Sequence, residues 1–187
     1  MRTFKPCMVA LSGLPLHGKT EVANHIAQHT NFVVQDVDEF RRKHFPAESG
    51  LVLQEVEEID IMIQSFRFMM ESVGYLTERS TPVILPSTFS RRVFKDELLR
   101  FMMNHRDIPA RIFRLDVHSE SVISARLAKR LAEGTASNVK TMERYRWSKT
   151  IVEPWPDGVK VTPVFAGGPV ETVAKLVLAQ LTDLIQQ

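Results

Sequence analysis

Eight residues near the N-terminus have the types and spacing that bind phosphate groups. Their sequence, GLPLHGKT, matches the pattern G-x-x-x-x-G-K-[ST] known as Walker A. In such a loop, backbone N–H groups point at phosphate oxygens, and the glycines permit the close turn. Lys19 would neutralise the β and γ phosphates, and the Thr20 hydroxyl would ligate Mg²⁺. We therefore predict ATP and Mg²⁺ as cofactors, with ATP bound by Gly13, Leu14, Pro15, Leu16, His17, Gly18, Lys19 and Thr20.

Two of these loop residues, Leu16 and His17, are larger than the residues usually found at their positions. Leu16 restricts the backbone conformations open to the loop, because only small residues turn freely there. The His17 side chain can either touch a phosphate or point to solvent. We expect it to point to solvent.

Two acids, Asp36 and Asp38, follow the second apolar run of the chain. Ligands of parallel sheets bind beyond the carboxyl ends of the strands, so carboxylates at this position would face the γ-phosphate. Such an acid can accept the proton of an attacking hydroxyl and hold that hydroxyl in line with phosphorus. The alternative is that these acids only cap the helix that follows.

Together with the loop, residues 36–41 resemble the P-loop kinases of the polynucleotide kinase and zeta toxin group, also described as AAA-type predicted kinases. In that group a glycine-proline loop is followed by an Asp-containing segment that ends in an aromatic residue and an arginine. The resemblance implies that Asp38 is the general base and that Arg41 contacts the acceptor or its phosphate. It places Asp36 on the acceptor side as well.

A second arginine motif follows the fourth predicted strand. Arg126 and Arg130 are four residues apart and so share one face of a helix. The resemblance implies that they belong to a lid, at about 119–150, that closes over the ATP phosphates and stabilises charge in the transition state. The predicted catalytic residues are then Lys19, Asp38, Arg126 and Arg130.

The end of the third predicted strand departs from the family pattern. In the family this strand ends in an aspartate that supports Mg²⁺, whereas here residues 83–85 lead into Pro86, Ser87 and Thr88. Ser87 and Thr88 could bind the acceptor or a metal-bound water. Three carboxylates could replace the missing acid: Asp36, Asp38 and Asp116.

The elements that must position these residues alternate along the chain. Short apolar runs predict strands, and longer runs with apolar residues three and four apart predict helices. Five strand-helix alternations indicate an α/β fold with a five-stranded parallel sheet flanked by helices and a helical lid, a P-loop NTPase. We expect a single kinase domain over 1–187. The predicted strands are 7–11, 32–34, 82–85, 110–115 and 159–165, and the predicted helices are 19–29, 51–76, 91–104, 119–132, 137–149 and 169–185.

The composition is that of a globular protein, with 44 % hydrophobic and 25 % charged residues and a net charge of +2. That charge is too small to indicate nucleic acid or a membrane as a partner. No apolar run is long enough to span a bilayer, and the N-terminal run is too short for a signal peptide. Cys7 is the single cysteine, which excludes an internal disulfide and a cysteine-cluster metal site. We expect a cytoplasmic protein.

These features predict a kinase that transfers the γ-phosphoryl group of ATP to a hydroxyl of a small molecule or nucleoside. One alternative acceptor is a nucleic-acid hydroxyl, at a 5′ end or on a modified base, with the basic residues of 41–43 and 140–149 following the phosphates. Another alternative is a nucleotide-binding protein that has lost catalysis, since the third strand lacks its acid. A steep fall of activity with salt would distinguish the nucleic-acid acceptor.

Overall fold

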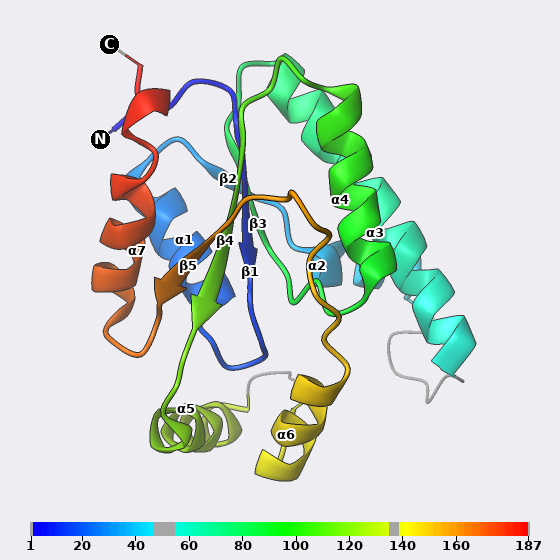
Figure 1. Ribbon diagram of the computed structural model, residues 1–187, viewed down its shortest axis with the longest axis vertical. Coiled ribbons are helices and arrows are strands. Elements are labelled where there is room, and N and C mark those ends of the chain that lie inside the picture. The colour runs from blue at the N-terminus through cyan, green and yellow to red at the C-terminus, as the bar shows by residue number, and fades with distance from the viewer. Residues whose placement is uncertain (1, 47–54, 135–138, 187) are drawn as a thin grey trace.

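A parallel sheet of five strands forms the centre of the protein, which a computed structural model describes over residues 2–46, 55–134 and 139–186 (Figure 1). Because all the strands are parallel, their carboxyl ends meet at one edge of the sheet. The strand β1 pairs with β3 on one side and with β4 on the other. Each predicted strand is present, and no strand end differs from its prediction by more than two residues. In sheet order the strands are β2 (Val33–Val34), β3 (Val83–Pro86), β1 (Met8–Ser12), β4 (Ala110–Asp116) and β5 (Val161–Phe165).

Helices cover both faces of this sheet, and two more lie beyond the carboxyl ends of its strands (Figure 1). One face is covered by α1 (Lys19–His29) and α7 (Val170–Ala179), and the other by α3 (Glu55–Glu78) and α4 (Arg92–Asn104). The helix α2 (Val37–His44) packs against α3. The two helices at the carboxyl edge are α5 (Glu120–Ala132) and α6 (Met142–Thr150).

Most predicted helices are present, with three differences. The sequence indicated a helix after Asp36 and Asp38 only as an alternative and gave it no bounds, because its eight residues are mostly charged. The last predicted helix ends earlier, at Ala179, and a short 3₁₀ turn over Thr182–Leu184 follows it. The predicted helix start at 51 lies outside the described residues. The helix predicted over 137–149 begins only at Met142, because the Thr141 side chain caps it by accepting the Arg144 N–H and residues 139–141 are not helical.

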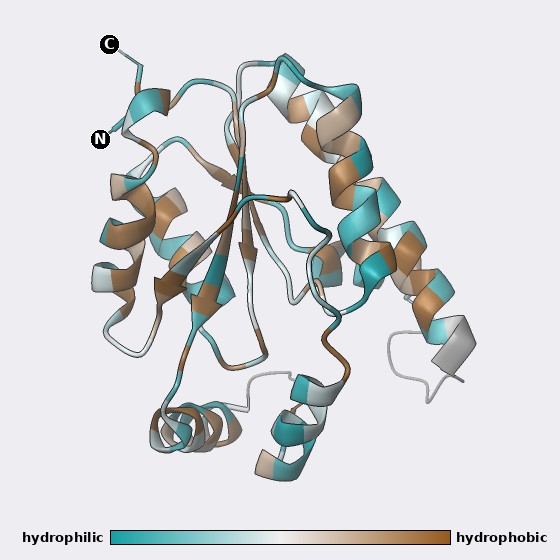
Figure 2. Ribbon diagram, in the orientation of Figure 1, coloured by the Kyte–Doolittle hydropathy of each residue, from teal (hydrophilic) through white to brown (hydrophobic). Residues whose placement is uncertain are grey.

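The core is divided by the sheet into two apolar clusters. Along β1, Val9 and Leu11 face the cluster under α1 and α7, whereas Met8 and Ala10 face the one under α3 and α4. Successive side chains of a strand point to opposite faces, so a central strand with apolar residues throughout must be buried on both. Figure 2 shows hydrophobic residues along the strands and on the helices that cover them. The strand that leads into the phosphate loop is thus buried on both faces.

The phosphate loop after β1 is seated on the end of β4. Gly13 has φ +143°, and a Cβ atom there would lie 2.7 Å from the carbonyl oxygen of Leu115. Any side chain at this position would therefore collide with β4, and only glycine fits. The first glycine of the motif lets the loop lie directly against the neighbouring strand.

The expectation that His17 points to solvent is wrong. Its side chain is only 4 % exposed, with Nδ1 2.6 Å from the Leu115 carbonyl oxygen and Nε2 3.1 Å from the Tyr145 hydroxyl. A carbonyl only accepts, so Nδ1 carries the proton and Nε2 accepts from Tyr145. The reason for the difference is non-local: β4 and α6 enclose the loop and supply both hydrogen-bond partners.

The buried histidine makes stability depend on pH. Burial lowers the pKa of His17 from 6.5 to about 4, and the nearby Lys19 charge also lowers it, although the hydrogen bond to Leu115 acts in the opposite direction. Between these two pH values the unfolded chain binds more protons than the folded one. The free energy of unfolding should therefore decrease as the pH falls through this window, by up to about 3 kcal/mol.

Denaturant unfolding of the wild type and of His17→Asn at several pH values measures this effect. Asparagine keeps a donor near the Leu115 carbonyl but does not titrate. The free energy of unfolding of the wild type should decrease relative to that of His17→Asn as the pH falls from 6.5 to 4. His29→Asn, at an exposed histidine, should follow the wild type. Parallel curves for the wild type and His17→Asn would contradict the assignment.

Candidate phosphate and acceptor site

The start of α1 is open to an anion. Gly18 caps the helix in a left-handed conformation, with φ 82°, and no side chain caps the amides of the first turn. These amides are free to bind phosphate oxygens, and the helix dipole favours a negative charge there. The Lys19 Nζ atom lies inside the loop, where it donates to the Leu14 carbonyl oxygen at 2.8 Å. The loop therefore has the features of a phosphate cradle.

The two arginines of α5 lie beside this cradle. Arg126 donates to the Leu16 carbonyl at 3.0 Å and to the Ala166 carbonyl at 2.7 Å, so it joins the loop to the segment between β5 and α7. Leu16 itself has φ 66°, a strained conformation for a residue with a side chain. Arg130 pairs with Glu21 at 3.1 Å. Arg126 thus holds the loop, whereas the ion pair of Arg130 with Glu21 lies at the surface.

The cations around the loop affect one another. Burial, followed by the charge of Arg130, lowers the pKa of Lys19 to about 8. Burial also lowers the pKa of Arg126, again with a contribution from Arg130. Three positive groups held this close favour a multiply charged anion, because such an anion offsets their mutual repulsion.

The acids after β2 have different roles. The Asp36 side chain accepts the backbone N–H of Asp38 at 3.0 Å and caps α2, so the helix-capping alternative holds for Asp36. Burial raises the pKa of Asp36. Asp38, in the first turn of α2, is exposed. Both charges act on Lys19 and favour its protonated form.

A cavity of about 400 Å³ opens between the carboxyl ends of β1, β3 and β4 and the segment that follows α6. Of the predicted acceptor residues only Thr88 lines it. Ser87 is buried, and Asp36 and Arg41 lie elsewhere, with the Arg41 guanidinium 3.9 Å from the Met62 sulfur on α3. The lining consists of Ser12, Gly13, Leu14, His17, Thr88, Phe89, Arg114, Asp116, Lys149, Val152, Glu153 and Trp155.

An ion pair forms part of this cavity. Arg114 and Asp116 are two residues apart on β4 and therefore share a face of the strand. The Arg114 Nε lies 3.0 Å from both carboxylate oxygens of Asp116, and Nη2 lies 2.9 Å from Oδ2. Hydrogen bonding to Asp116 raises the pKa of Arg114. The two charges compensate each other inside the cavity.

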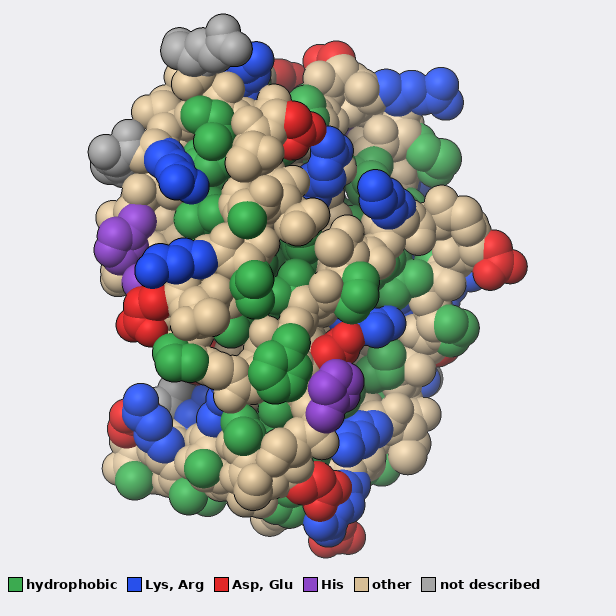
Figure 3. Space-filling view, turned by 60° about the vertical axis from the view of Figure 1, so that its left-hand side comes forward, with side chains coloured by type: hydrophobic (Ala, Val, Ile, Leu, Met, Phe, Trp, Pro, Cys, Tyr) green, Lys and Arg blue, Asp and Glu red, His purple; other side chains and the backbone are tan. Residues whose placement is uncertain are grey.

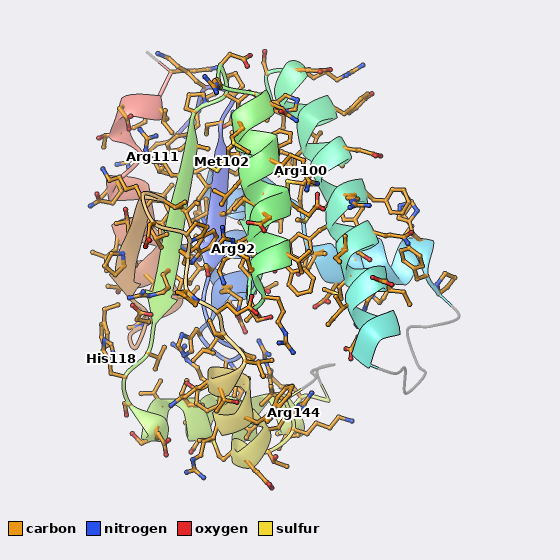
Figure 4. All side chains as sticks on the ribbon, turned by 45° about the vertical axis from the view of Figure 1, so that its right-hand side comes forward. Arg92, Arg100, Met102, Arg111, His118 and Arg144 are labelled. Atoms are coloured by element: carbon orange, nitrogen blue, oxygen red, sulfur yellow. The ribbon has the colours of Figure 1, made fainter. Side chains whose placement is uncertain are left out.

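The outer wall of the cavity also contacts the start of α4. The Glu153 carboxylate accepts the backbone N–H of Arg92 at the start of this helix, and the Glu153 N–H donates to the Ser90 carbonyl at 2.8 Å. Lys95 is 1 % exposed and donates to the Glu153 carbonyl at 2.6 Å. The Trp155 ring lies 5.4 Å from the Lys95 ammonium. Figure 4 shows Arg92 at the end of α4 nearest α6.

The described residues contain no cluster of three or more His, Cys, Asp or Glu side chains that could hold a metal. The end of β3, at Pro86, is buried and lacks an acid. Mg²⁺ in phosphate-binding sites takes few protein ligands, because phosphates and waters supply the rest. Thr20, at the start of α1, is the residue that would hold a nucleotide-bound Mg²⁺. The residues present fit an ion that arrives with its nucleotide.

The sequence reasoning missed several of the cavity residues as site residues: Arg114, Lys149, Glu153 and Trp155. One available signal was the pair Arg114-x-Asp116 at the end of a predicted strand. This pair could not be assigned to the site, because the sequence alone does not tell which strands lie next to the phosphate loop. In the part of the chain that is described, no helix is both long and apolar enough to cross a membrane.

Known structures share this architecture. A sugar kinase from Janibacter sp. HTCC2649 is 20% identical, with a TM-score of 0.68 and 95% of each chain covered. A gluconokinase from Sinorhizobium meliloti 1021 is 18% identical, with a TM-score of 0.64, 98% of this chain and 95% of that chain covered. The Mycobacterium tuberculosis APS kinase in complex with AMPPNP and APS is 15% identical, with a TM-score of 0.64, 95% of this chain and 98% of that chain covered.

Comparison of the sequence identifies the family of the chain. No curated protein matches the chain. The model of the AAA domain family matches residues 8–154, which include the phosphate loop, both acids after β2, the arginines of α5 and the wall residue Glu153. The chain therefore belongs to the AAA domain family and has a P-loop NTPase fold.

Proposed function

We propose that the protein is an ATP-dependent kinase that transfers the γ-phosphoryl group to a hydroxyl of a small molecule or nucleoside bound in the cavity. The observation that carries this proposal is that loop and cavity share residues: Gly13, Leu14 and His17 belong to both. An acceptor in the cavity would therefore lie next to the terminal phosphate. Structural neighbours named as sugar kinase, gluconokinase and APS kinase support this assignment. Within such kinases we place the chain in the polynucleotide kinase and zeta toxin group, on the motifs described above.

Each group of residues around the loop has its own role in phosphoryl transfer. The loop amides and Lys19 bind the β and γ phosphates, and Thr20 holds the metal, whose charge stabilises the phosphates when it is bound. Arg126 keeps the loop in place through the Leu16 carbonyl. Arg130, whose partner Glu21 is 55% exposed, can exchange this ion pair for a phosphate. In the reaction the acceptor oxygen bonds to the γ phosphorus, the bond from that phosphorus to the bridging oxygen breaks, and ADP leaves.

Asp38 is the carboxylate best able to take the acceptor proton. Asp116 lies in the cavity, but both of its oxygens already accept hydrogen bonds from Arg114. The Asp36 carboxylate caps α2. Asp38 is exposed and does not line the cavity, but its charge acts on Lys19. We keep Asp38 as the general base on the motif, which requires that the acceptor hydroxyl extends from the cavity toward the start of α2.

A small acceptor fits the surface charges better than a nucleic acid does. On α6, Arg146 and Lys149 both approach Glu120, at 3.0 and 3.9 Å, so this basic face is partly neutralised. On the face in Figure 3, Lys and Arg side chains lie beside Asp and Glu. Loss of catalysis is also disfavoured, because a protein that only binds nucleotide would need neither Asp38 nor Arg130.

Transfer from ATP labelled in the γ-phosphate to a panel of acceptors tests the proposal. The panel contains nucleosides, sugars, antibiotics, and DNA and RNA ends. We expect label on a small hydroxyl compound, with little dependence on salt. Label found on nucleic acid alone, with activity falling steeply as salt rises, would support the nucleic-acid alternative. Label on no acceptor would favour a protein without transferase activity.

Asp38→Asn should lower phosphoryl transfer by about 10²–10⁴-fold, because the amide cannot accept the proton. Binding of AMPPNP should change little, since the loop, Lys19 and Thr20 are intact. Asp36→Asn is the matched control: asparagine caps a helix as well as aspartate does, so both activity and stability should stay close to wild type. If Asp36→Asn loses activity and Asp38→Asn does not, the roles of the two acids are exchanged.

The lowered pKa of Lys19 predicts that nucleotide binding takes up a proton. In the protein without nucleotide, Lys19 loses its proton near pH 8, whereas bound phosphates would favour the protonated, charged form of Lys19. The affinity for ADP should therefore decrease as the pH rises above about 8. Calorimetry in buffers of different ionisation enthalpy measures the proton uptake directly. Lys19→Arg, which keeps the charge at every pH used, should show no uptake; equal uptake by both proteins would exclude Lys19 as its source.

A further inference from the structure

The hydrogen bond between His17 and Tyr145 joins two parts of the site that lie far apart in the sequence. His17 belongs to the phosphate loop, and Tyr145 lies in the middle of α6. Both side chains are buried, at 4 % and 1 % exposure. In the described residues, His17 Nε2 is the hydrogen-bond partner that the structure gives the Tyr145 hydroxyl. A buried hydroxyl without a partner is destabilising, so this bond is kept in the folded protein.

From Tyr145 the connection continues into the acceptor cavity. Lys149 follows one helical turn later on the same face of α6, with its ammonium 4.9 Å from the centre of the Tyr145 ring. Lys149 lines the cavity, and the chain beyond α6 provides the wall residues Val152, Glu153 and Trp155. Helix α6 therefore links the loop at one side to the cavity wall at the other.

The backbone at His17 is where a nucleotide would act. The N–H group of His17 donates within the loop to the Leu14 carbonyl at 3.3 Å, a long hydrogen bond. The same carbonyl accepts from Lys19 Nζ at 2.8 Å. A bound phosphate competes for both donors, because an anion accepts more strongly than a carbonyl. Drawing these donors to the phosphate would turn the His17 ring about its Nδ1 hydrogen bond to Leu115, and with it Nε2, the atom that holds Tyr145.

We propose that His17 and Tyr145 are positioning residues whose hydrogen bond makes the geometry of the cavity wall depend on whether a nucleotide occupies the phosphate loop. This inference rests on the proposed function only in requiring that the loop binds nucleotide. By thermodynamic linkage, an acceptor that fixes the wall would in turn favour nucleotide binding.

Trp155 provides a reporter for the wall that does not require a known acceptor. The chain has two tryptophans, and Trp147→Phe leaves Trp155 as the only one. AMPPNP with Mg²⁺ is titrated into this variant, its dissociation constant is measured by calorimetry, and the emission of Trp155 is recorded in parallel. We expect the Trp155 emission to change on AMPPNP binding, and the midpoint of this change to agree with the dissociation constant from calorimetry.

The link is then removed in the same background. Tyr145→Phe keeps the ring and removes the hydroxyl, and it should lower the amplitude of the emission change by more than half. The AMPPNP dissociation constant should change by less than about fivefold, since one hydrogen bond contributes about 1 kcal/mol. His17→Asn, which does not reach Tyr145, should also lose the emission change, so that the result does not depend on one variant.

Ser148→Ala is the matched control. It removes another buried hydroxyl of α6, whose hydrogen bond goes to the Tyr145 carbonyl at 2.6 Å and not to the loop. This variant should keep the full emission change. Loss of the change in both Tyr145→Phe and Ser148→Ala would show a general effect on α6 and would overturn the proposal.

The remaining outcomes separate this inference from the proposed function. AMPPNP binding without a change in Trp155 emission, or an unaltered change in Tyr145→Phe, would overturn the coupling and leave the kinase proposal standing. Absence of AMPPNP binding by calorimetry would overturn both.

Discussion

The contact of the phosphate loop with the Leu115 carbonyl is the constraint on which the rest of the site depends. This carbonyl closes one side of Gly13, where no side chain fits, and accepts the Nδ1 proton of His17. The loop is thereby fixed to β4 as well as to β1, from which it emerges. Its position relative to β4 sets where Lys19 lies, where the cavity opens and where α6 can attach.

The charges around the site are distributed unevenly. On the loop side, Lys19, Arg126 and Arg130 gather at the start of α1, and the helix dipole adds to their field. On the cavity side, Arg114 is compensated by Asp116. A phosphate chain is attracted to the first region, while the second has little net field to bind an anion. This division agrees with a charged donor in the loop and a polar, hydroxyl-bearing acceptor in the cavity.

Local patterns in the sequence were sufficient for the five strands and for α1. The strands are apolar runs, and α1 starts inside a phosphate-binding motif. Features that depend on distant partners were not accessible. The orientation of His17 is set by Leu115 and Tyr145, which are 98 and 128 residues away. The cavity could not be predicted either, because it lies where β1 meets its neighbours β3 and β4, and the sequence alone does not give the order of the strands in the sheet.

A crystal structure of the protein grown with AMPPNP and Mg²⁺ tests the central claim most directly. The account predicts phosphates bound by the amides of Gly13–Thr20 and by Lys19, with the γ phosphorus facing the cavity lined by Thr88 and Asp116. A nucleotide bound outside the loop, or one in the loop whose γ-phosphate points away from this cavity, would contradict it.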